Sequence, residues 1–169
     1  MSQATLLLLS AAVSGVVSFG VTRASTRYDY KLARRSRAVE QLTPHLYGLQ
    51  DLVVMADSGM VAGREFSDAI LGWNKAWNTY SVGLPRSWRF IYREANAAVG
   101  AFAGPQVFAA IDRRVWDEPL AEYDPGWQTK AEFYLKHLAA CVARCDERRP
   151  PQPQKFDTWL KSHDARRAE

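Results

Sequence analysis

Hydrophobic residues occur along the chain first as one unbroken run and then as stripes with helical spacing. The run covers residues 4–22, which contain no ionisable side chain. At about 1.5 Å per residue, a helix of this length is about 28 Å long, close to the hydrocarbon thickness of a bilayer. We therefore expect residues 1–22 to form a transmembrane anchor, with the lipid bilayer as its partner.

A basic segment follows the apolar run. It contributes +5 (six cations minus Asp29) to a net charge of +4, so the rest of the chain sums to about −1. The positive-inside rule then predicts an outside N-terminus and a cytoplasmic C-terminal domain at the plasma membrane. A nucleic-acid-binding domain would carry its cations on a folded face, so we expect no nucleic-acid partner. The topology-determining residues are Arg23, Arg27, Lys31, Arg34, Arg35 and Arg37.

Two other interpretations of the N-terminal run remain open. A cleaved signal peptide usually begins with Lys or Arg and ends at a small-residue site, whereas residues 1–3 carry no basic side chain. A buried core helix is the other alternative, but an unbroken apolar run followed by cations is not typical of one. The anchor is the interpretation that we adopt.

Small hydroxyl residues recur within the predicted anchor at Ser10, Ser14 and Ser18. Small residues four apart let two membrane helices approach closely and hydrogen-bond. These serines are candidate helix-contact residues and, with the stripe that follows, could support a weak homodimer. Alternatively, they reflect only the composition of a moderately apolar span.

A stripe with alternating four- and three-residue spacing, with Arg35 as its one break, predicts a basic juxtamembrane helix over residues 23–43 that continues into the next domain. Pro44 interrupts it, so the helix either kinks there or restarts with Thr43 as its N-cap. The stripe could form a dimer seam or pack into the chain's own bundle, which needs no partner. Its members are Tyr28, Leu32, Val39, Leu42, Leu46, Leu49 and Val53.

Further helical stripes separated by Gly and Pro predict a helical bundle over residues 44–149. No segment alternates with the two-residue period of a strand. We therefore expect an all-α protein, with one transmembrane helix and a cytoplasmic bundle of about four to five helices. The stripes begin at Phe66, Trp88, Phe108 and Trp127, and the Phe108 stripe continues through Ile111 and Val115.

Residues 150–169 are predicted to be a Pro-rich linker and a short tail. Pro150, Pro151 and Pro153 favour an extended linker. The tail could form a basic amphipathic helix that lies on an anionic leaflet. Alternatively, it docks one Trp on the bundle or stays without fixed structure.

Candidate chemistry is sparse. His137, Cys141 and Cys145 lie at successive turns of one predicted helix, but three collinear positions span about 12 Å, so two ligands at most could share an ion. His137 and Cys141 are weak metal candidates, and burial as core residues is the alternative. Two cysteines poorly placed to pair with each other fit a reducing compartment. No catalytic motif is present, and no cofactor is expected.

These features favour a non-enzymatic interaction or scaffold module tethered to the membrane, with a protein partner. One alternative is an enzyme or small-ligand-binding bundle whose pocket has no sequence signature. Another is an exported helical domain released by signal-peptide cleavage.

Overall fold

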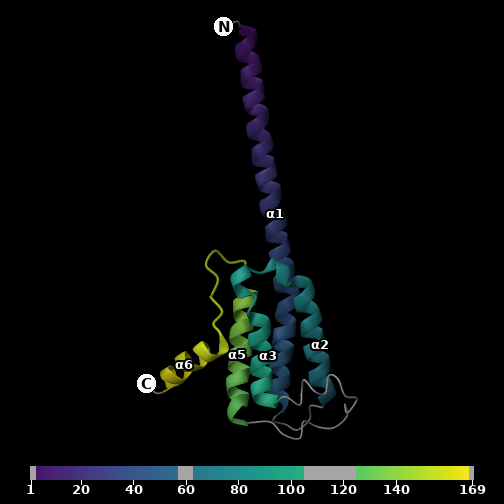
Figure 1. The fold of residues 1–169 in the computed structure, drawn as a ribbon, viewed down its shortest axis with the longest axis vertical. Coiled ribbons are helices and arrows are strands. Elements are labelled where there is room, and N and C mark those ends of the chain that lie inside the picture. The colour runs from purple at the N-terminus through teal and green to yellow at the C-terminus, as the bar shows by residue number, and fades with distance from the viewer. Residues whose placement is uncertain (1–2, 57–62, 105–124, 168–169) are drawn as a thin grey trace. The chain divides into compact units, whose positions relative to one another are not determined.

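All regular elements in the described ranges are helices (Figure 1). The computed structural model describes residues 3–56, 63–104 and 125–167, with side chains for 25–56, 64–104 and 126–165. The predicted all-α fold class is confirmed, and these ranges contain no strand. The elements are α1 (Gln3–Ala56), α2 (Gly63–Tyr80), two short 3-10 helices (Ser81–Gly83 and Arg86–Trp88), α3 (Ile91–Ala103), α5 (Pro125–Ala143) and α6 (Phe156–Arg167).

The chain divides by its internal contacts into two compact units, Met1–Arg34 and Arg35–Glu169. The predicted anchor belongs to the first unit, and its side chains, including Ser10, Ser14, Ser18 and the following Arg23, lie outside the described residues. Within the part of the chain that was described, no helix is at once long enough and apolar enough to cross a membrane.

Helix α1 continues through Pro44, so of the two alternatives for this residue the restart of a new helix does not occur. The hydroxyl of Thr43 has no hydrogen-bond partner among the described residues, as expected for a residue that is not an N-cap. Proline inside a helix removes one backbone hydrogen bond and costs about 3 kcal/mol. Burial of Leu42 and Leu46 on either side of Pro44 offsets this cost, because both side chains are fully buried.

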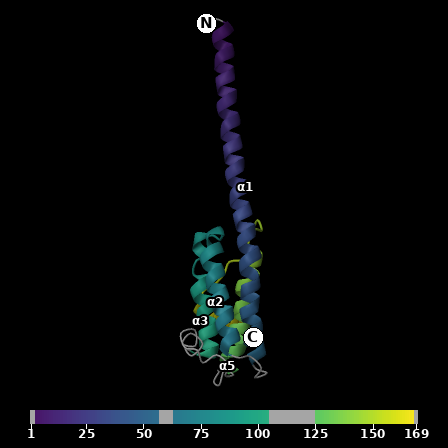
Figure 2. The same cartoon turned by 90° about the vertical axis from the view of Figure 1, so that its right-hand side faces the viewer.

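Residues 35–56 of α1 pack with α2, α3 and α5 in an up-down-up-down bundle (Figures 1 and 2). Gly72 lets α2 approach α1 closely, since a Cβ at this position would lie 3.3 Å from Cε1 of His45. Gln128 of α5 donates a hydrogen bond to the carbonyl of Val53 in α1, at 3.0 Å. Between α2 and α3, the rings of Phe66 and Phe102 lie 6.2 Å apart.

The stripe on α1 packs into the chain's own bundle from Leu42 to Val53, where its core residues are fully buried. The N-terminal members of the stripe are not buried: Leu32 is 46% exposed and Tyr28 is 67% exposed. The described part of the first unit contains no helix besides α1.

The remaining stripes form the other walls of the core. Phe66, Ile70 and Trp73 are buried on α2, and Tyr134 and Leu138 are buried on α5. Trp73 and Trp77 are both core residues. The stripe containing Phe108, Ile111 and Val115 lies outside the described residues.

Trp88 provides a test of the core. It is 2% exposed in the 3-10 segment before α3, so its replacement leaves a cavity. We expect Trp88→Ala to lower the free energy of unfolding of a 35–169 fragment by about 3–5 kcal/mol, measured by urea denaturation followed by circular dichroism. Tyr47→Ala, at an exposed site on α1, is the control and should change it by about 0.5 kcal/mol or less. Equal effects of the two substitutions would contradict the assigned core.

Candidate functional site

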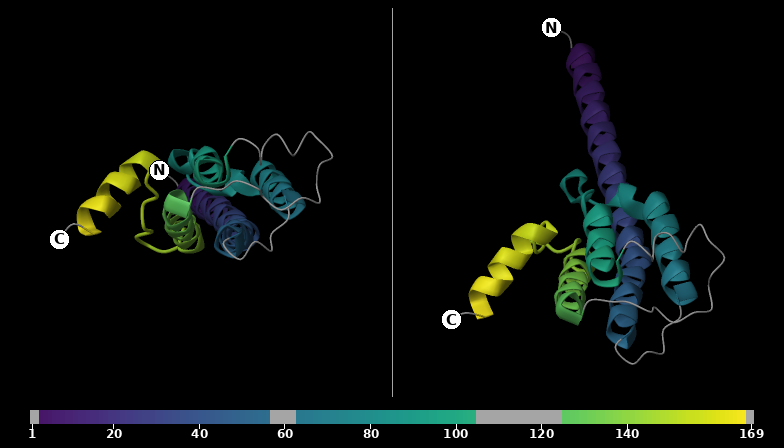
Figure 3. Two further views of the ribbon diagram at one scale, coloured as in Figure 1. Left: turned by 90° about the horizontal axis from the view of Figure 1, so that it is seen from below. Right: turned by 60° about the horizontal axis from the view of Figure 1, so that its bottom comes forward.

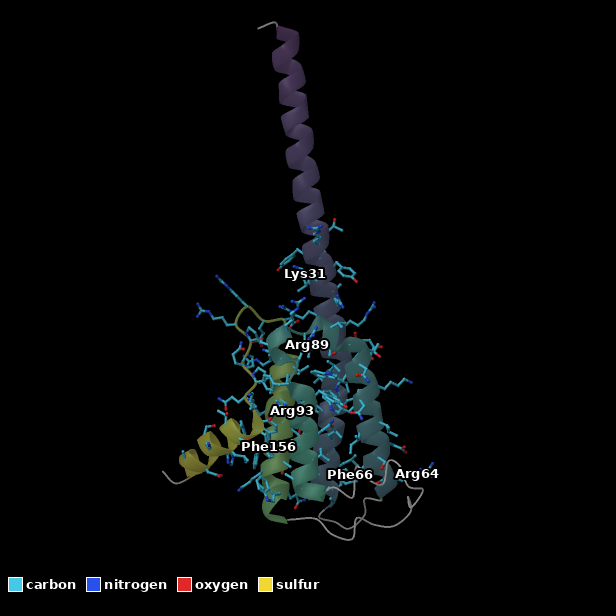
Figure 4. The ribbon with its side chains drawn as sticks, viewed as in Figure 1. Lys31, Arg64, Phe66, Arg89, Arg93 and Phe156 are labelled. Carbon is cyan, nitrogen blue, oxygen red and sulfur yellow. The ribbon has the colours of Figure 1, made fainter. Side chains whose placement is uncertain are left out.

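A buried carboxylate on α3 holds the beginning of α6. Oε2 of Glu94 accepts a hydrogen bond from the backbone N–H of Phe156 at 2.8 Å, and Oε1 accepts one from Arg93 at 3.1 Å. The first N–H groups of a helix have no partner within the helix, and a negative charge there is stabilising. Glu94 therefore caps α6 from a different helix (Figure 4 labels Arg93 and Phe156).

The Pro-rich linker before α6 is held by side chains of the bundle. The hydroxyl of Tyr134 donates to the carbonyl of Gln154 at 2.7 Å, and the N–H of Gln154 donates to Nε2 of His137 at 3.4 Å. Nε1 of Trp88 donates to the side-chain oxygen of Gln152 at 3.4 Å. An extended proline-rich segment has no regular backbone hydrogen bonds of its own. These contacts, with a hydrogen bond from the Gln152 amide to the carbonyl of Pro150 at 3.3 Å, supply its partners.

Aromatic rings complete the contact between the tail and the bundle. Phe156 and Trp159 are each 6% exposed, and their ring centroids lie 4.7 Å and 5.4 Å from that of Tyr134. Trp159 also stacks on His163 at 4.7 Å. The tail is thus a helix that docks on the bundle, and it does so through two aromatic rings rather than through one Trp alone (Figure 3 shows α6 beside α5). We call Glu94, Tyr134, His137, Phe156 and Trp159 the tail-docking site.

The predicted metal candidates belong to the edge of this site. Sγ of Cys141 lies 3.8 Å from Nε2 of His137, the atom that already accepts the hydrogen bond from Gln154. Across the described ranges, no group of three or more His, Cys, Asp or Glu side chains is arranged to hold a metal ion. His137 and Cys141 are therefore adjacent, but the structure adds no further ligand to them.

Burial controls protonation around the tail-docking site. It raises the pKa of the Cys141 thiol to about 11 and also raises the pKa of Cys145. Burial, and then the charge of Glu94, raise the pKa of Tyr134 above its ordinary value. The thiols therefore stay neutral at pH 7, although metal ligation and nucleophilic attack require thiolate. Tyr134 stays a hydrogen-bond donor.

A second feature is a set of unpartnered polar atoms on α2 and α3. Asn74 lies seven residues after Ser67, on the same flank of α2, and Asn96 follows Tyr92 by one turn on α3. The rings of Tyr92 and Trp73 lie 6.4 Å apart, so the two helices are in contact at Trp73. We call this set the α2–α3 polar seam. Its buried atoms without a hydrogen-bond partner in the described structure are Oγ of Ser67, Nε1 of Trp73, Oδ1 of Asn74 and Oδ1 of Asn96.

Sequence reasoning did not identify the polar seam. Each unpartnered buried atom costs about 1–3 kcal/mol, so the seam is unfavourable unless water or a ligand supplies partners. The only signal in the sequence is that polar residues interrupt two apolar flanks, and such residues more often face solvent. Glu94 was also missed, because its partner is 62 positions away.

A third feature is the basic segment on α1. Arg27, Lys31 and Arg34 are exposed and, with Thr26 and Tyr30, line a shallow depression of about 540 Å³. Of the other predicted topology residues, Arg37 is exposed and Arg35 is half-buried. The structure therefore brings three of the six predicted cations together on one surface.

Removing the cap of α6 should release the tail. Glu94→Ala leaves the N–H of Phe156 without its charged acceptor. The lost hydrogen bond stabilises the docked tail by about 1.5–3 kcal/mol, so its removal favours local opening of α6. We expect trypsin to cleave after Lys155 and Lys161 about tenfold faster or more in the folded variant, measured by mass spectrometry. Glu94→Gln retains an acceptor and should give a smaller increase.

Glu40→Ala is the matched control for this experiment, since Glu40 is an exposed glutamate on α1. It should leave cleavage after Lys155 and Lys161 unchanged. Cleavage of Glu94→Ala at the wild-type rate would show that Glu94 does not hold the tail.

Comparison with protein-family models, with curated proteins and with solved structures gives no match. Function is therefore inferred from the residues and contacts described above.

Proposed function

We propose that this chain is a single-pass membrane protein whose helical domain lies at the cytoplasmic face and serves as a non-enzymatic interaction module. The observation that carries the proposal is the step in charge along the sequence. Residues 4–22 have no ionisable side chain, and six cations follow between Arg23 and Arg37. Such a step is typical of an uncleaved anchor with its positive side in the cytoplasm.

The exposed residues after the apolar run support this assignment. Tyr28 and Tyr30 are each 67% exposed, and Arg27, Lys31 and Arg34 are exposed on the same helix. Tyrosine rings and cations are enriched where a membrane helix leaves the bilayer, because both interact favourably with headgroups. The free, buried cysteines Cys141 and Cys145 are consistent with a reducing compartment.

The tail-docking site supports an interaction role for the bundle. It accepts a short helix through two rings, one helix cap and three further hydrogen bonds along the linker, which is a mode that proteins use for partner helices. An anchor would concentrate such a domain at the membrane surface and raise its effective concentration for a membrane-bound protein partner.

Fusion of reporters after Glu169 tests the orientation. We expect activity from a reporter that works only in the cytoplasm and none from one that works only outside it. Changing Arg34, Arg35 and Arg37 to Gln and inserting Lys after Ser2 should give mixed orientation. Activity of the outside reporter in the wild-type fusion would contradict the proposal, and N-terminal sequencing would then show whether a signal peptide had been removed.

The α2–α3 polar seam favours a second candidate function, binding of a small neutral polar ligand. Unpartnered buried polar atoms are costly, and proteins retain such costs mainly at functional sites. Asparagine side chains offer both a donor and an acceptor, and Trp73 adds an N–H donor.

A stability measurement distinguishes a ligand site from a hydrated structural contact. If the seam is kept for a ligand, Asn96→Leu should raise the free energy of unfolding of the ligand-free protein by about 1–3 kcal/mol, because it removes an unpartnered group. Asn78→Leu, at an exposed site on α2, should have little effect. Destabilisation by Asn96→Leu in urea denaturation would instead indicate that water satisfies the asparagine.

A further inference from the structure

Three exposed cations share one face of α1. Lys31 follows Arg27 by four residues and Arg34 follows Lys31 by three, and residues at these spacings are neighbours on a helix surface. None of the three pairs with a carboxylate among the described side chains (Figure 4 labels Lys31). We call Arg27, Lys31 and Arg34 the basic face.

The nearby acidic side chain does not neutralise this face. Asp29 lies two residues after Arg27, about 200° round the helix axis, and accepts a hydrogen bond from the hydroxyl of Ser25 at 3.4 Å. The basic face therefore presents three uncompensated positive charges within two helical turns.

The surroundings of the basic face suit a phosphate-bearing ligand. Tyr30 lines the same depression and carries a hydroxyl group. Guanidinium groups bind phosphate through paired hydrogen bonds, and lysine adds a point charge. The ligand class is therefore anionic, with phosphate oxygens as the recognised atoms.

We propose that the basic face binds the headgroups of anionic phospholipids. This inference rests on the proposed membrane anchor, because the face begins five residues after the apolar run ends at residue 22 and so belongs at headgroup level. Each Lys or Arg near an anionic surface strengthens binding by about fivefold. Loss of two cations should therefore weaken the interaction by roughly 25-fold.

Native mass spectrometry of the full chain in neutral detergent, titrated with phosphatidylglycerol or phosphatidylcholine, tests this site. We expect the wild type to retain phosphatidylglycerol in preference to phosphatidylcholine. Arg27→Gln combined with Lys31→Gln should reduce phosphatidylglycerol adducts by roughly 25-fold, in line with the charge removed. Excess inorganic phosphate should not displace the lipid.

A charge-relocation variant is the matched control. It combines Arg27→Gln and Lys31→Gln with Tyr28→Arg and Leu32→Lys, which keeps the net charge and moves two cations about 100° round the helix. The new sites accept the change because Tyr28 and Leu32 are exposed. We expect this variant to bind phosphatidylglycerol more weakly than the wild type, because it no longer presents three cations on one face of the helix.

Three results would overturn the proposal: wild-type lipid binding by the relocated variant, equal binding of both lipids by the wild type, or displacement by phosphate. Wild-type binding by the relocated variant would mean that only the net charge matters, and displacement by phosphate would mean that the face binds free phosphate.

Extraction of the protein from membranes with alkaline carbonate tests the anchor separately. If the chain is extracted, sedimentation with phosphatidylglycerol vesicles, using the same variants, still tests the basic face.

Discussion

Burial of one face of α1 between Ala38 and Val53 is the interaction on which the bundle depends. The core residues of this face are fully buried, and the helix contacts α2 and α5. Gly72 sets the approach of α2 beside His45, and Gln128 fixes α5 at the carbonyl of Val53. Because α1 supplies one complete wall, its removal would expose apolar surface on α2, α3 and α5 together.

The tail-docking site is a consequence of that packing. Glu94 lies on α3 and Tyr134 on α5, so the cap for α6 and the donor for Gln154 are brought together only when these helices are held by the common core. The docked rings of Phe156 and Trp159 then extend the same hydrophobic cluster. A single core thus determines both the bundle and the position of the tail.

Hydrophobic periodicity predicted the all-α class and the described core stripes because each helix buries one continuous face. Periodicity alone did not show where the buried part of the α1 stripe begins, because Leu32 keeps the spacing of the stripe and is 46% exposed. Glu94 and Asn96 carry no local signal, because their roles depend on groups that belong to other helices. Pro44 was ambiguous for a similar reason, since tertiary packing decides whether a helix continues through proline.

Hydrogen exchange of the full-length protein, followed by mass spectrometry, tests most directly whether α1 is an integral wall of the bundle. Amides of residues 38–53 should be protected to the same free energy as those of α3, because both open only in global unfolding. Exchange in residues 38–53 that is orders of magnitude faster, with α3 and α5 still protected, would contradict this account.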